Sequence, residues 1–192
     1  MRAQPDLTAA VRVIVDKIDA SIPKQYQGET IKMFVGGGIA ANYHCGTRYT
    51  EDIDASFSKR LLLNFAELNV PYTRRDGSSS FLYLDPNYNA SFALLHEDFE
   101  VDAIEWKELG NEQRRVHVYV FSPEDLAVSK IARFSEQDRE DIKNLAGCGL
   151  IDAAQVEKRA SAALKNFIGN VKPVQTNIET ACRDIAETRK LF

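Results

Sequence analysis

Residues 35–54 read VGGGIAANYHCGTRYTEDID and carry the strongest signal in the chain. The apolar run that leads into them, Ile31–Val35, predicts a buried strand. The glycines that follow, Gly36–Gly38, allow a sharp turn in which backbone N–H groups can approach a ligand closely. Further along, Asp52 and Asp54 are separated by one residue, and this spacing in a strand places both carboxylates on one face. The stretch therefore predicts a metal-dependent phosphate site.

Neither half of this stretch is specific by itself, because most glycine runs are ordinary turns and most Asp-x-Asp sequences are solvated loops. The combination is more specific. It resembles the signature of the DNA polymerase beta-like nucleotidyltransferase superfamily, in which a strand, a glycine turn and a short helix precede the residues found here as Arg48, Thr50, Asp52 and Asp54. More narrowly, the order Gly-Gly, short helix, Arg-x-Thr-x-Asp-x-Asp is similar to that of AbiEii-type and related minimal nucleotidyltransferases of toxin–antitoxin systems.

The resemblance extends over about residues 31–146 and implies an α+β fold, a nucleotidyltransferase-fold mixed β-sheet with flanking helices and a C-terminal helical lobe. We expect a core over residues 1–121 and a helical lobe over residues 122–192 that packs on the core and shares its active-site cleft. Periodicity and capping signals predict the order of the elements. They are a helix (about 6–20), a strand (31–35), a helix (38–45), a strand (52–57), a helix (59–68), a strand-rich middle (80–105), a strand (115–121) and helices near 123–133, 136–146, 152–167 and 175–190.

A two-metal site generally needs a third carboxylate, and residues 98–106 offer candidates. Acidic and apolar residues alternate there, which in a strand puts Glu100 and Asp102 on one face and their apolar neighbours on the other. An exposed edge strand would show the same pattern. We prefer Asp102 to Glu100, because the corresponding acid of the resembling family is an aspartate in the middle of the strand that follows the paired carboxylates.

Basic residues follow in a helix that is predicted to begin at the capping sequence Ser122–Asp125. Lys130 and Arg133 lie three positions apart on one side of that helix and are placed to face a polyphosphate, although most such pairs are solvated surface charges. The resembling family has the same Glu-Asp-Leu, helical Lys and Arg, and acid-rich helix. Asp141, in that acid-rich helix, is expected to contact Lys130 or Arg133, either at a nucleotide or as an ordinary ion pair between helices.

The resemblance implies a specific reaction. Asp52 and Asp54 would hold two Mg²⁺ (or Mn²⁺) ions, and Asp102 would complete the shell of the ion nearer the nucleophile. An acceptor hydroxyl would attack the α-phosphorus of a nucleoside triphosphate in line with the leaving group, through positioning and electrostatic stabilisation. Lys130 would offset the charge that builds on the leaving pyrophosphate.

The resemblance also implies how the nucleotide binds. Gly36, Gly37 and Thr50 would hold triphosphate oxygens at the glycine turn. Many nucleotidyltransferases have Gly-Ser where this chain has Gly-Gly, so Thr50 or Arg48 must replace the missing hydroxyl. The full set of residues expected to bind the nucleotide is Gly36, Gly37, Arg48, Thr50, Lys130, Arg133 and Asp141.

Composition limits the class of protein. At 192 residues and 44% hydrophobic content, the chain is long enough for one substantial core without disulfides. Its three cysteines are widely spaced and form no Cys-x-x-Cys pair, which argues against a disulfide framework or a structural zinc site and favours a reducing cytoplasm. No stretch is expected to span a membrane, and the first residues lack the apolar core of a signal peptide.

The sequence does not reveal the acceptor. Members of the resembling group modify RNA such as tRNA as toxins, modify a partner protein as antitoxins, or act on small molecules, so a cognate antitoxin is a possible partner. A net charge of −4 gives no overall attraction to nucleic acid, and an RNA acceptor would need a local basic surface such as Arg74–Arg75 or Arg114–Arg115. A catalytically silent nucleotide-binding module is the alternative from another class. It is disfavoured because three acids that repel one another without metal have no reason to persist in a dead site.

Overall fold

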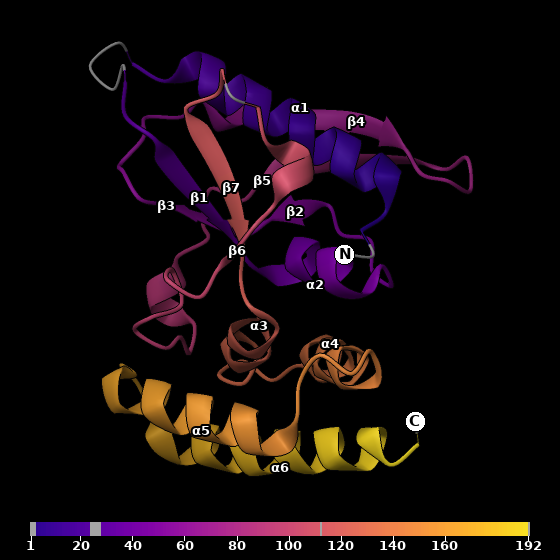
Figure 1. The fold of residues 1–192 in the computed structure, drawn as a ribbon, viewed down its shortest axis with the longest axis vertical. Helices are drawn as coiled ribbons and strands as arrows, with labels where there is room; N and C mark the ends of the chain where they lie inside the picture. Colours follow the sequence, from indigo (N-terminus) through magenta and orange to yellow (C-terminus); the bar gives the residue numbers. More distant parts are fainter. Residues whose placement is uncertain (1–2, 24–27, 112, 192) are drawn as a thin grey trace. The chain divides into compact units, whose positions relative to one another are not determined.

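The computed structural model describes residues 3–23, 28–111 and 113–191 (Figure 1). The chain divides into two compact units, the first made of residues 1–88 and 104–120 and the second of residues 89–103 and 121–192. Strands dominate the first unit and helices the second, so the fold is α+β with a helical C-terminal region, as predicted. None of the helices in the described ranges is long and apolar enough to cross a membrane.

A four-stranded sheet in the first unit positions the glycine turn. Its strand order is β3 (Ala55–Phe57), β1 (Ile31–Val35), β7 (Val116–Val120) and β6 (Ile104–Glu105). β1 runs parallel to β7 and antiparallel to β3, and β6 is antiparallel to β7. Every residue of β1 except Lys32 is buried, as expected for a central strand that is covered on both faces. This strand therefore fixes the position at which the glycines leave the sheet.

A second, three-stranded sheet in the same unit carries the first acid of the pair. Its order is β2 (Asp52–Ile53), β5 (Ser79–Leu84) and β4 (Asn69–Thr73). β2 is parallel to β5, and β5 is antiparallel to β4. Exposed and buried residues alternate strictly along β5, so one face of this sheet packs inward and the other is open to solvent.

Helix α1 (Pro5–Ser21) covers the inner side of these strands, where it packs against β4, β5 and β7. Proline occupies its first turn, where no backbone donor is lost, and its buried residues recur at helical spacing: Leu7, Ala10, Val11, Ile14, Val15 and Ile18. The predicted helix over residues 6–20 is confirmed. The short helix α2 (Gly37–Cys45) follows the glycine turn and packs against β2.

The second unit contains four helices in its described residues, α3 (Pro123–Ser129), α4 (Glu136–Gly147), α5 (Ala153–Ala163) and α6 (Val171–Arg189). α6 packs against both α4 and α5, and α3 packs against α4 and α5. Ser122 caps α3, and Ser135 forms a reciprocal capping box with Asp138 at the start of α4. Both predicted helix starts are confirmed.

Two predicted elements are wrong. The strand expected over residues 52–57 is interrupted at Asp54 and forms two strands in different sheets. The helix expected over residues 59–68 is absent, and only a 3₁₀ turn forms at Phe65–Glu67. Three consecutive leucines, residues 61–63, do not make the one-sided stripe that a helix buries, and Leu62 is 84% exposed.

The middle of the chain is also less regular than predicted. Between β5 and β6, residues 85–103 form turns and a 3₁₀ segment, Ala90–Phe92, instead of further strands. The alternation over residues 98–106 is misleading, because the backbone N–H of Asp102 donates to the carbonyl of Asp98, as in a helical turn. Asp102 is therefore not in a strand, and Glu100 is exposed in the same turn.

Candidate functional site

The glycine turn and the acid strand of the first unit pack directly against each other. Gly37 has φ of 53°, a left-handed conformation, and a Cβ at this position would lie 1.8 Å from Oδ2 of Asp54. A Cβ on Gly38 would lie 2.7 Å from Cβ of Thr50. The N–H of Gly36 also donates to the backbone carbonyl of Asp54 at 2.9 Å. Glycine is thus required here because the acid-bearing segment lies where side chains would otherwise be.

This turn leads into the N-terminus of α2. Its N-cap residue, Gly36, has no side chain that could cap the helix, and the helix dipole favours negative charge at this end. The close approach of Gly37 to Asp54 places a carboxylate at the same point. A phosphate bound at this helix end would therefore need a cation to offset the repulsion from the acid.

Asp52 and Asp54 lie on the solvent side of their segment. Both are partly exposed, whereas Ile53 between them is fully buried. The hydroxyl of Thr50, which is buried, donates to Oδ1 of Asp52 and so orients that carboxylate. Arg48 lies in the loop before them, where its backbone carbonyl accepts a hydrogen bond from Asn42 at 2.5 Å. Four residues predicted from one short motif are thus gathered in one unit.

Three residues beside the acid pair were not predicted from the sequence. The parallel register of β2 and β5 places Tyr83 beside Asp52, and the N–H of Asp85 donates to the carbonyl of Ile53 at 3.1 Å. Burial and then the carboxylates of Asp52 and Asp85 raise the pKa of Tyr83. Burial and then the charge of Asp54 likewise raise the pKa of Tyr88. Residues 80–105 were predicted to be rich in strands, but nothing in the nearby sequence indicates which strand β5 pairs with.

The acid pair fits a magnesium or manganese ion that is shared with a phosphorylated substrate. Its donors are hard carboxylate oxygens, and Mg²⁺ is commonly bound by one or two carboxylates together with substrate phosphates and water. Among the described residues, no group of three or more His, Cys, Asp or Glu side chains could hold a metal ion alone. The remaining ligands would therefore be phosphate oxygens and water. After burial, the nearby carboxylates contribute to the raised pKa of Tyr83 and Tyr88, and such a cation would offset that contribution.

Asp102, predicted as the third metal ligand, belongs to the second unit. Its carboxylate accepts a hydrogen bond of 2.7 Å from Nη2 of Arg159. Arg159 is held in turn by the fully buried Asp125, to which its Nε and Nη2 donate at 2.8 Å each. Within the second unit Asp102 thus serves as the ion-pair partner of Arg159, and its role as a metal ligand stays a prediction.

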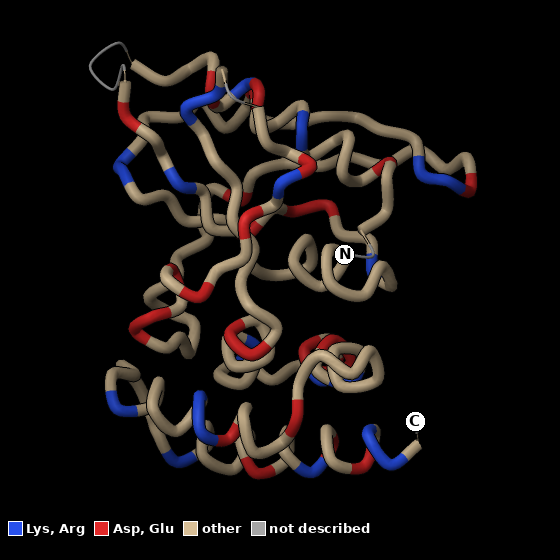
Figure 2. The backbone as a smooth tube through the Cα atoms, in the orientation of Figure 1, with Lys and Arg blue, Asp and Glu red and all other residues tan. Residues whose placement is uncertain are grey.

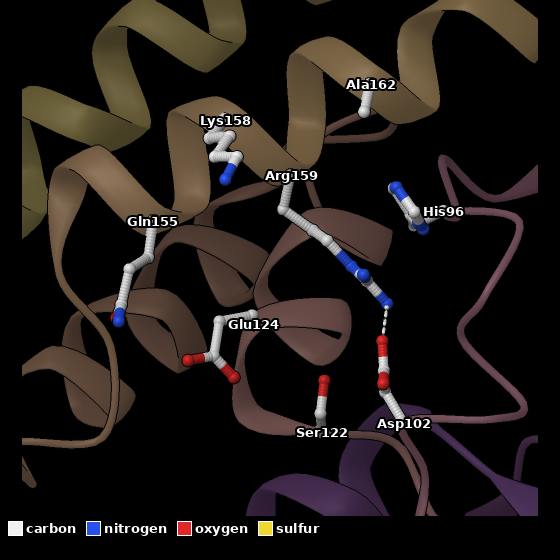
Figure 3. A pocket seen from close by; sticks show the side chains of 8 residues that line it. All are labelled: His96, Asp102, Ser122, Glu124, Gln155, Lys158, Arg159 and Ala162. Carbon is white, nitrogen blue, oxygen red and sulfur yellow. Dashed lines mark hydrogen bonds and ion pairs between the residues drawn. The ribbon is translucent and has the colours of Figure 1, made fainter.

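Arg159 and Asp102 line a cavity of about 330 Å³ within the second unit (Figure 3). Its wall mixes basic, acidic and neutral side chains: His96, Asp102, Ser122, Glu124, Gln155, Lys158, Arg159 and Ala162. Figure 3 shows the guanidinium of Arg159 extended across the cavity to Asp102. Because Arg159 is already paired with Asp102, the cavity has no clear preference for an anionic ligand.

Lys130 is buried in an acidic cluster. It ends α3, is 5% exposed, and places Nζ 2.6 Å from Asp141 and 3.8 Å from Asp138. The predicted contact between Asp141 and Lys130 is confirmed. Arg133, whose side chain is 75% exposed, donates two hydrogen bonds of 2.8 Å to Asp138. The two acids neutralise Lys130 within the unit, and its catalytic role stays a prediction.

Comparison with protein families identifies one match. The family described as nucleotidyltransferase of unknown function (DUF6036) matches residues 15–189, from within α1 to the end of α6. No curated protein and no solved structure matches the chain. Since the matched region covers most of the sequence, the chain belongs to this family of nucleotidyltransferases.

Proposed function

We propose that the protein moves a nucleoside monophosphate from a nucleoside triphosphate to an acceptor hydroxyl, with Mg²⁺ or Mn²⁺ and release of pyrophosphate. The observation that carries the proposal is the contact between the glycine turn and the acid strand. Gly37, at the start of α2, lies directly against Asp54. The helix start suits a phosphate and the acid pair suits a divalent cation, so the two binding features are adjacent.

Each residue at this place has a part in the proposed reaction. Asp52 and Asp54 would hold the metal, and Thr50 keeps Asp52 oriented. The backbone of Gly36 and Gly37 would contact triphosphate oxygens. The bound metal would neutralise phosphate charge and fix the geometry of the α-phosphate. An acceptor oxygen would form a bond to the α-phosphorus while the bond to the bridging oxygen breaks and pyrophosphate leaves, the acceptor proton passing to solvent.

The second unit would contribute cations and a further acid. We retain Asp102 as the third carboxylate, which must then exchange its hydrogen bond from Arg159 for the metal. Lys130, Arg133 and Asp141 would serve the nucleotide. Of these, Arg133 has the side chain most open to solvent, and Lys130 would act through its field from a buried position. Arg48 would support the triphosphate beside Thr50.

The test of this function is transfer of label. Protein incubated with each radiolabelled nucleoside triphosphate, Mg²⁺ and either total RNA or cell lysate should label one RNA or protein band. Asp52→Asn and Asp54→Asn should abolish the label without loss of fold. Glu51→Gln is the matched control, because Glu51 is an exposed acid beside Asp52 and should be dispensable. Equal labelling by all four proteins would overturn the proposal.

The acceptor hypothesis we favour is RNA, such as tRNA, with the protein acting as a toxin that a cognate antitoxin restrains. Figure 2 shows Lys and Arg interleaved with Asp and Glu along both units. The hairpin between β4 and β5 presents Arg75 as an exposed cation, while Arg74 stacks over Tyr49 and donates to Ser80. Expression should then arrest bacterial growth, and Asp52→Ala should relieve the arrest.

Other outcomes of these assays favour the alternatives. A labelled protein band in place of RNA would identify an antitoxin-like transferase that modifies a partner protein. Nucleotide binding with no transfer to any acceptor would identify a silent interaction module. Arg75→Glu should weaken RNA labelling most at low salt, and the loss relative to wild type should shrink as salt rises, since each lost phosphate contact lowers the salt dependence of binding. Unchanged RNA labelling in that variant would place the acceptor surface elsewhere.

A further inference from the structure

A groove lies beside the acid pair in the first unit. It has a volume of about 420 Å³ and runs between the 3₁₀ turn before β4 and the segment that follows β5. The lining residues that matter for recognition are Phe65, Asn69, Tyr83, Asp85, Pro86 and Asn87.

The groove is continuous with the acid pair through Tyr83. In the parallel register of β2 and β5, Tyr83 is the direct neighbour of Asp52 (strand labels in Figure 1), and adjacent strands lie about 4.8 Å apart. Both Asp52 and Tyr83 are on the open side of the sheet, since Ile53 and Leu84 fill the buried side. A ligand that reaches the acid pair can therefore extend directly over the tyrosine ring.

The walls of the groove suit a flat aromatic ring with polar edges. Phe65 and Tyr83 are each 38% exposed, and Pro86 adds a third apolar surface. At the rim, Asn69 and Asn87 offer amide donors and acceptors. In the ranges that the structure describes, neither side-chain amide has a hydrogen-bond partner.

Asp85 adds a third chemical feature. Its Oδ1 accepts a hydrogen bond of 2.8 Å from the backbone N–H of Asn87, which fixes the carboxylate at the edge of the groove. A carboxylate held beside a nucleotide site commonly accepts a hydrogen bond from a ribose hydroxyl. From the acid pair outwards, the surface thus offers groups for metal-bound phosphate, for ribose and for a stacked base.

We propose that this groove binds the base of the nucleoside triphosphate whose phosphates bind at Asp52 and Asp54. This inference rests on the proposed nucleotidyl transfer and names the part of the site that recognises the donor base. A nucleotide satisfies both the acid pair, through its metal-bound phosphates, and the aromatic walls. An acyl chain or an apolar peptide would leave Asp85 and the two amides without partners.

The test compares ligands with and without a base. Binding of the four Mg²⁺–nucleoside triphosphates and of Mg²⁺–tripolyphosphate is measured by calorimetry on wild-type protein and variants. Tyr83→Ala should weaken nucleotide binding about ten- to a hundredfold, the range that stacking on one aromatic side chain supplies, and leave tripolyphosphate binding unchanged. Tyr83→Phe should retain nucleotide binding, because the ring remains.

Two further variants keep the result specific. Phe81→Ala is the matched control, because Phe81 lies on the same face of β5 and is 54% exposed but does not line the groove. It should leave both ligands unaffected. Tyr83→Leu keeps apolar bulk in the strand without an aromatic face and should behave like Tyr83→Ala, which separates stacking from damage to the sheet.

The results that would contradict the proposed function differ from those that would contradict the base groove. Wild-type protein that binds neither tripolyphosphate nor any nucleotide would overturn the proposed function and this inference with it. Tripolyphosphate and nucleotides bound with equal affinity, or nucleotide affinity unchanged by Tyr83→Ala, would overturn the base groove alone. An equal loss in Phe81→Ala would also overturn it, because the effect would then belong to the sheet and not to the groove.

Discussion

The two units use the same residue type, aspartate, in opposite environments. In the second unit Asp125, Asp138 and Asp141 are almost completely buried, and each is paired with a lysine or arginine. In the first unit Asp52 and Asp54 are partly exposed, and among the described residues Asp52 forms no ion pair. The buried acids are neutralised within the protein, whereas the partly exposed Asp52 keeps its negative charge for a cation. Environment therefore separates structural acids from a candidate site.

The largest effect on stability is expected at Asp141. Asp141→Asn leaves the buried Lys130 without the negative charge that faces it at 2.6 Å and should cost about 3–5 kcal/mol in the free energy of unfolding. Glu140→Gln, an exposed acid on the same helix, is the control and should change stability by less than about 0.5 kcal/mol. Urea unfolding of the three proteins checks this. Equal stabilities would mean that the cluster is not structural.

A somewhat smaller effect is expected from pH. Although burial opposes it, hydrogen bonds from Arg133 and Ser135 lower the pKa of Asp138 to about 2. A carboxyl with a lowered folded-state pKa stabilises the fold above its ordinary pKa, and that stabilisation is lost as pH falls through the folded value. Stability should thus drop by roughly 2 kcal/mol between about pH 4 and pH 2 through this residue.

Unfolding of Asp138→Asn across the same range isolates this contribution. The variant should be less stable than wild type at neutral pH, and the difference should shrink towards pH 2. A constant difference would show that Asp138 titrates normally in the folded protein. Direct observation of its carboxyl carbon by NMR gives the pKa independently.

A third prediction breaks the first unit at its tightest contact. Gly37→Ala combines a left-handed backbone with a collision against Asp54. It should lower the free energy of unfolding by about 1–2 kcal/mol and abolish label transfer. Gly77→Ala is the matched control, because Gly77 has φ of 84° but open space around its Cβ position. It should be destabilised by the backbone alone and keep activity. Full activity in Gly37→Ala would separate the turn from the site.

The smallest stability effect is expected at the acid pair itself. Asp52→Asn should leave the free energy of unfolding within about 0.5 kcal/mol of wild type, since the residue is partly exposed and the amide still accepts the hydrogen bond from Thr50. Mn²⁺ binding, followed by electron paramagnetic resonance, should weaken at least tenfold. A large loss of stability instead would make Asp52 a structural acid like those of the second unit.

Much of the site could be predicted because its parts are close in the sequence. The turn, Thr50 and the acid pair fall within about twenty residues, and glycine conformation and strand spacing restrict how such a segment folds. The helix starts at Ser122 and Ser135 were predictable for the same reason, since a cap involves residues three positions apart. The division into residues 1–121 and 122–192 stays a proposal.

What failed depended on neighbours far along the chain. Alternation at residues 98–106 matched a strand, yet only Ile104 and Glu105 pair, with β7, and Asp102 lies in a turn and contacts Arg159, 57 positions away. A lysine and an arginine at helical spacing suggested one basic surface, but α3 ends at Ser129, and the turn that follows buries Lys130 and exposes Arg133. Periodicity gives the faces of an element and does not say which face will be covered.

The sequence by itself determined the glycine turn, the shared face of Asp52 and Asp54, and the class of fold, because local backbone preferences and short spacings control them. Only the tertiary structure decided that β5 lies parallel to β2. That pairing places Tyr83 and Asp85 beside the acid pair from about thirty positions away. It also decided that Lys130 is neutralised by Asp141. Strand pairing and charge burial depend on which distant segments pack together, and that choice is made by the whole core.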